Sequence, residues 1–159
     1  FFIDTQVVNA AYNADVKKTL VLCSSEIYAP KTPLPFKEDS LLNIKPEALS
    51  DPYHIAKITA LKTCHAHNGL KRPRFIFCPY PYLCGPHDTG FEIRSTHPVK
   101  NIASRLLKAK WKKEGFAVIS NDGRARYELM HIDDMTSAVV FLLTAPAEDE
   151  IINIAYGQD

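Results

Sequence analysis

The chain has 159 residues, of which 46% are apolar and 23% charged, and its formal net charge at neutral pH is +1. This length and composition are typical of one globular domain with a sizeable core. The nearly neutral charge excludes a global field that would recruit nucleic acid or an anionic membrane, and no apolar run approaches the length of a membrane span. We therefore expect neither nucleic acid nor membrane as a partner.

The cysteines match neither a zinc ribbon nor a CxxC redox pair, although the chain has four of them. Free thiols in apolar runs behave as small hydrophobes. We expect no metal site and a reducing, cytoplasmic setting.

Short apolar runs alternate with helical patterns along the first half of the chain. The proline-rich connection is unsuited to a continuous helix or a central strand. The expected elements are a helix over Ile3–Asn13, a strand buried on both faces over Thr19–Cys23, a connection over Tyr28–Asp51, and a helix over Pro52–His67 capped by Asp51.

The second half repeats the alternation. We expect a strand over Arg74–Cys78, an irregular stretch over 79–97, a helix over Pro98–Lys110, a strand over Ala117–Ser120 ending at a turn, a helix capped by Asp133 or Asp134 and reaching Leu143, and a strand over Ile151–Ile154. The pattern predicts an α/β fold, a doubly wound and mainly parallel sheet of Rossmann-like type with helices on both faces. Because both ends fall within expected elements, we expect missing sequence on either side.

A serine pair and a tyrosine–lysine pair are the candidate catalytic groups. Ser24 and Ser25 follow the first strand, and ligands of open parallel sheets bind beyond the carboxyl ends of strands. Tyr53 and Lys57 lie four residues apart on the next helix and share one face. A nearby ammonium lowers the pKa of a phenol, which is otherwise about 10. The pattern therefore predicts a proton-transfer site that works beside a nicotinamide cofactor.

Four motifs occur in order: Leu22–Tyr28 (LCSSEIY), Pro52–Lys57 (PYHIAK), Gly85–Asp88 (GPHD) and His131–Met135 (HIDDM). Together they resemble the extended short-chain dehydrogenases of the NAD(P)-dependent epimerase/dehydratase family. Within it, they are most similar to the branch that converts GDP-4-keto-6-deoxymannose to GDP-L-fucose. The resemblance implies that residues 1–159 are the C-terminal part of a dinucleotide-binding domain with the start of the substrate region.

The resemblance also implies roles for individual residues. Tyr53 would be the general acid, Lys57 would lower its pKa and hold the nicotinamide ribose, Ser24 would orient the substrate, and His97 would assist epimerisation. The implied cofactor is NADP or NAD, the substrate a nucleotide sugar, and the assembly a homodimer. The implied cofactor-binding residues are Leu22, Cys23, Ser24, Ser25, Tyr53, Lys57, Tyr80, Pro81, Tyr82, Leu83 and His97. The implied substrate contacts are Ser24, Arg105 and Arg126.

Several positions depart from the family pattern. Glu26 stands where the branch has a cysteine that takes part in epimerisation, and Glu26 could itself serve as acid or base. The loop from Tyr80 to Gly85 differs, Ser120 replaces a tryptophan, and the arginine expected at 127 is displaced to Arg126. No glycine-rich phosphate loop is present, so we expect the isolated chain to bind NADP(H) weakly or not at all.

Other interpretations remain open. Another nucleotide-sugar epimerase or dehydratase, or a non-catalytic nucleotide-binding relative, also fits the motifs. His65 and His67 suggest a metal, but residues two apart on a helix point to different faces. The basic run around Trp111 is better explained as a solvated helix end than as a nucleic-acid patch, and the absence of GxSxG argues against a serine hydrolase.

Overall fold

The computed structural model describes residues 2–29, 32–42, 44, 52–70, 75–87, 97–119, 122–146 and 148–158. Four positions of the expected motifs and elements, Asp51, Arg74, Asp88 and Ser120, therefore lie outside the described residues. So do parts of the expected connection over 28–51 and of the stretch over 79–97. Within the described residues, no helix is long and apolar enough to cross a membrane.

Two parallel strands form the centre of the fold, β1 (Thr19–Ser24) and β2 (Phe75–Tyr80). They pair in register from Thr19 opposite Phe75 to Ser24 opposite Tyr80. The segment after Glu150 runs along the other edge of β2, where the Phe77 amide donates to the Glu150 carbonyl at 2.8 Å. The strand expected over Ile151–Ile154 appears as this segment, with a parallel bridge between Ile151 and Phe77.

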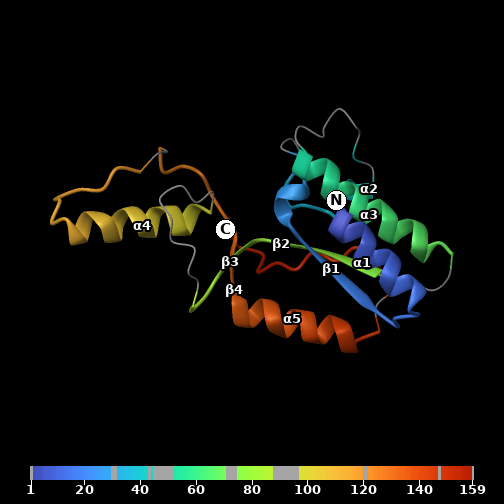
Figure 1. The fold of residues 1–159 in the computed structure, drawn as a ribbon. Coiled ribbons are helices and arrows are strands. Elements are labelled where there is room, and N and C mark those ends of the chain that lie inside the picture. Colours follow the sequence, from blue (N-terminus) through green and yellow to red (C-terminus); the bar gives the residue numbers. More distant parts are fainter. Residues whose placement is uncertain are drawn as a thin grey trace.

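Helices cover both faces of these strands, as expected of a doubly wound fold (Figure 1). Helices α1 (Phe2–Asn13) and α3 (Pro52–Asn68) lie on one face, and α5 (Ile132–Thr144) lies on the other. Side chains of β2 alternate between the two cores: Phe75 and Phe77 join the clusters on the α1 and α3 side, whereas Ile76 and Cys78 join the cluster on the α5 side.

A second pair of parallel strands, β3 (Tyr82–Cys84) and β4 (Leu129–His131), continues from the first sheet. The helix α4 (Pro98–Trp111) extends away from the sheets in Figure 1. Two short helices follow β1: η1 (Ser25–Ile27) directly after it and α2 (Asp39–Leu42) within the proline-rich connection. The expected helices over 3–13, 52–67 and 98–110 are thus confirmed.

Three expectations about strands are wrong. β2 continues through Pro79 to Tyr80, since Pro79 lacks an amide hydrogen but its carbonyl still accepts from the Ile154 amide at 2.8 Å. Residues 117–119 form no strand, because no other strand pairs with them among the described residues. Val118 is 66% exposed. β1 is not buried on both faces: only Cys23 is buried, and Leu22 is 41% exposed.

The cap of α5 also differs from the expectation. His131 rather than Asp133 or Asp134 occupies the cap position, and its Nδ1 accepts from the Asp133 amide at 3.2 Å. The two aspartates instead lie in the first turn, where their charge interacts favourably with the helix dipole.

Gly85 occupies a close approach between the end of β3 and the start of α5. A Cβ added at Gly85 would lie 2.4 Å from Cγ2 of Ile132. We expect Gly85→Ala to lower the free energy of unfolding by about 1–3 kcal/mol, because an extra methyl in a packed contact forces displacement. Denaturant titration measures this loss.

Two further variants test the cause. Ile132→Ala removes the clashing methyl and should recover part of the stability lost in Gly85→Ala. Gly115→Ala is the matched control, because a Cβ there meets nothing within 4 Å. Equal losses at both glycines would contradict the close-approach explanation.

Candidate active site

Ser24 lies at the carboxyl end of β1, where the chain turns into η1. Its backbone is still extended, with φ −63° and ψ 144°, and its Oγ accepts from the Glu26 amide at 3.2 Å. Because a serine hydroxyl can cap a helical turn in this way, the SSE sequence forms the turn locally. Ser24 pairs in register with Tyr80, so both residues lie at the same edge of the sheet.

Tyr53 projects from the first turn of α3 toward this edge. The Ser24 backbone and the Cys23 side chain both influence the pKa of its phenol, so the phenol lies close to the end of β1. The tyrosine is nevertheless 42% exposed, so a ligand can reach it. Tyr53 and Ser24 are 29 positions apart in the sequence, but the fold brings them close together at the end of β1.

The pKa of the Tyr53 phenol is raised, whereas a lowered value was expected from Lys57. Burial is the largest cause, followed by the nearby Cys23 thiol and Tyr80; the hydrogen bond with the Ser24 backbone acts in the opposite direction. Burial disfavours the charged phenolate. The Tyr53 phenol is therefore held in its protonated form, which is the form that donates a proton.

Lys57 lies one turn after Tyr53 and forms an ion pair with Asp4 of α1. Its Nζ is 3.1 Å from both carboxylate oxygens of Asp4. The two side chains are 23% and 22% exposed, so the pair is mostly withdrawn from water. Asp4 precedes Lys57 by 53 positions and no local motif links the two residues, so this pair could not be predicted from the sequence.

Cys23 connects these groups. Its thiol is 2% exposed, and burial raises its pKa to about 11, while the Lys57 ammonium and the Tyr53 hydrogen bond act to lower it and the Asp4 carboxylate acts to raise it. The thiol is therefore within electrostatic reach of both charges and lies near the phenol. Cys23 is buried because it lies in an apolar strand, but no sequence motif predicts its interactions with Tyr53, Lys57 and Asp4.

A second group of polar side chains lies beyond the first, around Tyr82 of β3. The Tyr82 hydroxyl donates to the Glu26 carboxylate. The ring lies edge-on to His97 at 5.0 Å and to Tyr127 at 5.5 Å between centroids. The pKa of the Tyr82 phenol is raised, first by burial and then by the hydrogen bond and charge of Glu26. Glu26 thus has a fixed partner.

His97 is held by backbone groups. Its Nε2 lies 2.9 Å from the Leu83 carbonyl, and its Nδ1 accepts from the Lys100 amide at 3.5 Å as the cap of α4. A carbonyl can only accept, so Nε2 carries the hydrogen and the ring is in one neutral tautomer. In this arrangement, His97 orients α4 and packs on Tyr82.

The strand register gives the positions of the remaining residues that we expect to contact the cofactor. Leu22, Cys23 and Ser24 end β1 opposite Cys78, Pro79 and Tyr80, and Ser25 begins η1. Pro81 is buried between the two sheets' strands, and Tyr82 and Leu83 begin β3. Tyr53 and Leu22 are each about two-fifths exposed, so both are accessible, and their roles as cofactor contacts stay predictions.

The two expected substrate arginines lie on or near other elements, α4 and β4. Arg105 of α4 donates from Nε to Asn101 Oδ1 at 2.8 Å and from Nη1 to the Val118 carbonyl at 2.9 Å. Arg126 is exposed in the segment before β4. Neither is brought near Tyr53 by a described contact, and their substrate roles stay predictions.

No group of three or more metal-ligating side chains occurs among the described residues. His65 is paired with Glu150 at 2.5 Å, whereas His67 stacks on Tyr12 with ring centroids 4.3 Å apart and bonds Asn9 at 2.8 Å. The two histidines thus have separate partners on different faces of α3, as the helical spacing predicts.

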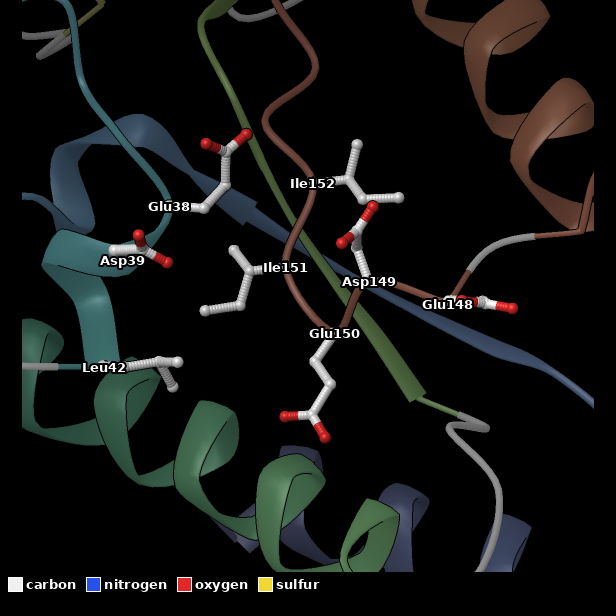
Figure 2. A pocket seen from close by; sticks show the side chains of 8 residues that line it. All are labelled: Glu38, Asp39, Leu42, Glu148, Asp149, Glu150, Ile151 and Ile152. Atoms are coloured by element: carbon white, nitrogen blue, oxygen red, sulfur yellow. The ribbon is translucent and has the colours of Figure 1, made fainter.

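A cavity of about 590 Å³ lies between α2 and the segment that runs beside β2 (Figure 2). Ser24, Tyr53 and Lys57 are not among the residues that line it. Its wall carries five carboxylate side chains with three apolar ones. Among these carboxylates, Glu38 accepts from the Asn153 amide at 3.0 Å, and Glu150 pairs with His65. A smaller cavity of about 280 Å³ adjoins Ser25 and Glu26. Only the smaller one borders the polar edge of the sheet.

Comparison with known proteins decides the family. A family model described as "NAD dependent epimerase/dehydratase family" matches residues 2–155. This chain belongs to that family. It is 35% identical over 157 residues to GDP-L-fucose synthase 1 of Arabidopsis thaliana, covering 99% of this chain and 48% of the relative. It is 32% identical over 155 residues to a GDP-L-fucose synthase of Sinorhizobium fredii, covering 98% of this chain and 49% of the relative.

The fold agrees with solved structures of the family. A GDP-L-fucose synthetase from Naegleria fowleri bound to NADP superposes with a TM-score of 0.82 at 19% identity, covering 98% of this chain and 52% of that one. The Rossmann-like α/β fold expected from the sequence is thus confirmed. The chain spans about half the length of the curated relatives that it matches.

Proposed function

We propose that the protein carrying this chain is an NADP-dependent epimerase/reductase that converts GDP-4-keto-6-deoxymannose to GDP-L-fucose. The observation that carries this proposal is the meeting of the Tyr53 phenol with the end of β1 at Ser24, one helical turn from Lys57. Relatives named GDP-L-fucose synthase support the substrate class. Incubation with this keto sugar and NADPH tests it: GDP-L-fucose should form as NADPH is consumed.

The reductive half depends on three side chains. The cofactor would supply hydride to C4 of the keto sugar. Ser24 would hold the keto oxygen through its hydroxyl, and Tyr53 would give its phenolic proton to that oxygen. Lys57 would hold the ribose of the cofactor through an ammonium hydrogen. The protonated state of Tyr53 suits this direction, because a proton must be donated when the ketone becomes an alcohol.

The epimerising half would use Glu26. A proton on C3 or C5 lies next to the C4 ketone, so its removal leaves the electron pair in an enolate. The Glu26 carboxylate would accept that proton, and a proton from solvent would return to the opposite face. The Tyr82 hydroxyl donates to Glu26, and this bond holds the carboxylate in place. Glu26 would thus replace the cysteine of the fucose-forming branch.

We propose NADP as the cofactor, with NAD as the alternative. A structural neighbour bound to NADP supports the first, and the family description names NAD. Competition between the two nucleotides in the turnover assay separates them.

The isolated chain should bind the cofactor weakly, because its sequence has no glycine-rich turn to bind the pyrophosphate. We expect a dissociation constant for NADPH weaker than about 10 μM, corresponding to a binding free energy smaller than about 7 kcal/mol. Isothermal titration of residues 1–159 with NADPH measures it. A sub-micromolar constant would contradict the expectation.

We also propose a homodimer in the cytoplasm. Apolar side chains on α1 and α3 support a partner at these helices, since Phe2 is 77%, Ile3 79% and Ile55 51% exposed. The oligomeric state of the intact protein, measured by light scattering, tests the dimer.

Two other functions remain candidates. Another nucleotide-sugar epimerase or dehydratase would turn over a different keto sugar or UDP sugar with the same Tyr53. A non-catalytic nucleotide-binding relative is favoured by the altered loop from Tyr80 to Gly85 and by the displaced Arg126. Loss of turnover in Tyr53→Phe separates the enzymes from the non-catalytic relative.

A further inference from the structure

The ion pair between Asp4 and Lys57 joins α1 to the proposed active site. Both Asp4 oxygens lie 3.1 Å from the Lys57 ammonium, and both side chains are nearly four-fifths buried. Asp4 lies in the first turn of a helix whose neighbouring side chains, Phe2 and Ile3, are more than three-quarters exposed. The carboxylate is thus turned inward onto the lysine while its neighbours face outward.

Lys57 lies one helical turn after Tyr53 on the same face of α3. Both side chains lie near Cys23 of β1, and the pKa of its thiol is influenced by the Lys57 ammonium and by the Asp4 carboxylate in opposite directions. An ammonium bound by a single carboxylate keeps at least one further hydrogen, since a lysine has three donors. Lys57 can therefore bind Asp4 and a ribose hydroxyl at the same time.

We propose that Asp4 is a positioning residue of the catalytic centre: its carboxylate fixes the Lys57 ammonium beside the end of β1 and offsets the positive charge that this ammonium presents to Tyr53. The proposal rests on the proposed reductase function. Asp4 touches neither substrate nor cofactor, and it acts through Lys57. Without the carboxylate, the ammonium loses its fixed place and its charge acts on the phenol uncompensated.

The groups that face the Tyr53 phenol come from four elements. Cys23 of β1 and Tyr80 of β2 influence the phenol directly, and His54 of α3 lies edge-on to its ring. Lys57 of α3, paired with Asp4 of α1, lies one helical turn further along the same face. Removing the one carboxylate of this set leaves the ammonium, and a nearby positive charge favours a phenolate. The phenol of an Asp4→Asn variant should therefore lose its proton at a lower pH than that of the unmodified protein.

The test uses Asp4→Asn and Asp4→Glu in the intact protein. For Asp4→Asn, kcat of ketone reduction should fall about tenfold, the factor that corresponds to one lost charge-assisted hydrogen bond. The alkaline limb of kcat against pH should move down by about half a unit or more, while KM for the nucleotide sugar stays within about twofold. Asp4→Glu should restore the limb. The control Glu114→Gln, which removes the exposed pair with Lys112, should change neither.

A second measurement is independent of turnover. Tyrosines labelled with ¹³C at Cζ report phenol ionisation by NMR, and Tyr53→Phe assigns the relevant signal. Its titration should move to lower pH in Asp4→Asn. If the alkaline limb and this titration both stay unchanged, and only the melting temperature falls, Asp4 merely ties α1 to α3 and the proposal is overturned. If the unmodified protein shows no nicotinamide-dependent turnover, the proposed function fails, and the NMR titration alone decides the role of Asp4.

Discussion

Tyr53→Phe is expected to lower kcat of ketone reduction about 10²–10⁴-fold, the usual contribution of a positioned proton donor. The substitution removes the hydroxyl that lies near the Ser24 backbone and the Cys23 side chain, and with it the proton to be donated. KM should change little, because a residue used mainly in the transition state affects kcat and kcat/KM alike. Stopped-flow oxidation of NADPH by the intact protein measures the loss.

The pH dependence of the unmodified protein gives an associated check. Because the pKa of Tyr53 is raised, the phenol stays protonated through neutral and mildly alkaline pH. The reductive rate should therefore not decline through loss of this proton until the solution is strongly alkaline. Tyr156→Phe is the matched control, since Tyr156 is 65% exposed and outside the site. Equal rates for Tyr53→Phe and the control would refute the enzymatic proposal.

Glu26→Gln is expected to abolish most of the epimerising half while sparing the reductive half. Exchange of the C3 and C5 hydrogens of the keto sugar with D₂O, followed by mass spectrometry without NADPH, reports epimerisation alone. The exchange rate should fall about 10²–10⁴-fold, because an amide cannot accept the carbon-bound proton. With NADPH, the variant should still reduce the ketone but yield a sugar that has not been inverted at C3 and C5.

Two variants show whether the loss is specific to Glu26. Tyr82→Phe removes the hydroxyl that donates to Glu26, and it should slow exchange by about tenfold, as expected for one hydrogen bond to a charged group. Tyr53→Phe should exchange at nearly the normal rate, since it affects only the reductive half. If Glu26→Gln exchanges as fast as the unmodified protein, another residue is the base.

The local sequence was enough for the elements that carry the chemistry. Pro52 at the first helical position and the helical spacing after it predicted α3, so Tyr53 and Lys57 had to share one face. The apolar run before Ser24 predicted β1, and the rule for parallel strands placed the hydroxyl at the ligand-binding edge. These features depend on residues within about two helical turns of one another.

Elements that depend on distant partners could not be found this way. The segment over 117–119 has the apolar residues of a strand but no partner strand, whereas Leu129–His131 pairs with β3 despite a weak pattern. β-structure requires a neighbour to satisfy its backbone groups, and that neighbour lies far away along the chain. Similarly, His131 caps α5 because its ring accepts from the Asp133 amide. The sequence alone favoured the two aspartates, which are more common capping residues.

The sequence by itself determined the family, the parallel α/β architecture and the identity of the candidate hydroxyl, phenol and amine, because each is set by a short motif or a local periodicity. Only the tertiary structure decided which charges surround them. It brought Asp4 to Lys57 across 53 positions, Cys23 to Tyr53 and Tyr82 to Glu26. The physical reason is that the protonation state of a buried phenol depends on desolvation and on charges within a few ångströms, and the packing of separate helices and strands sets both.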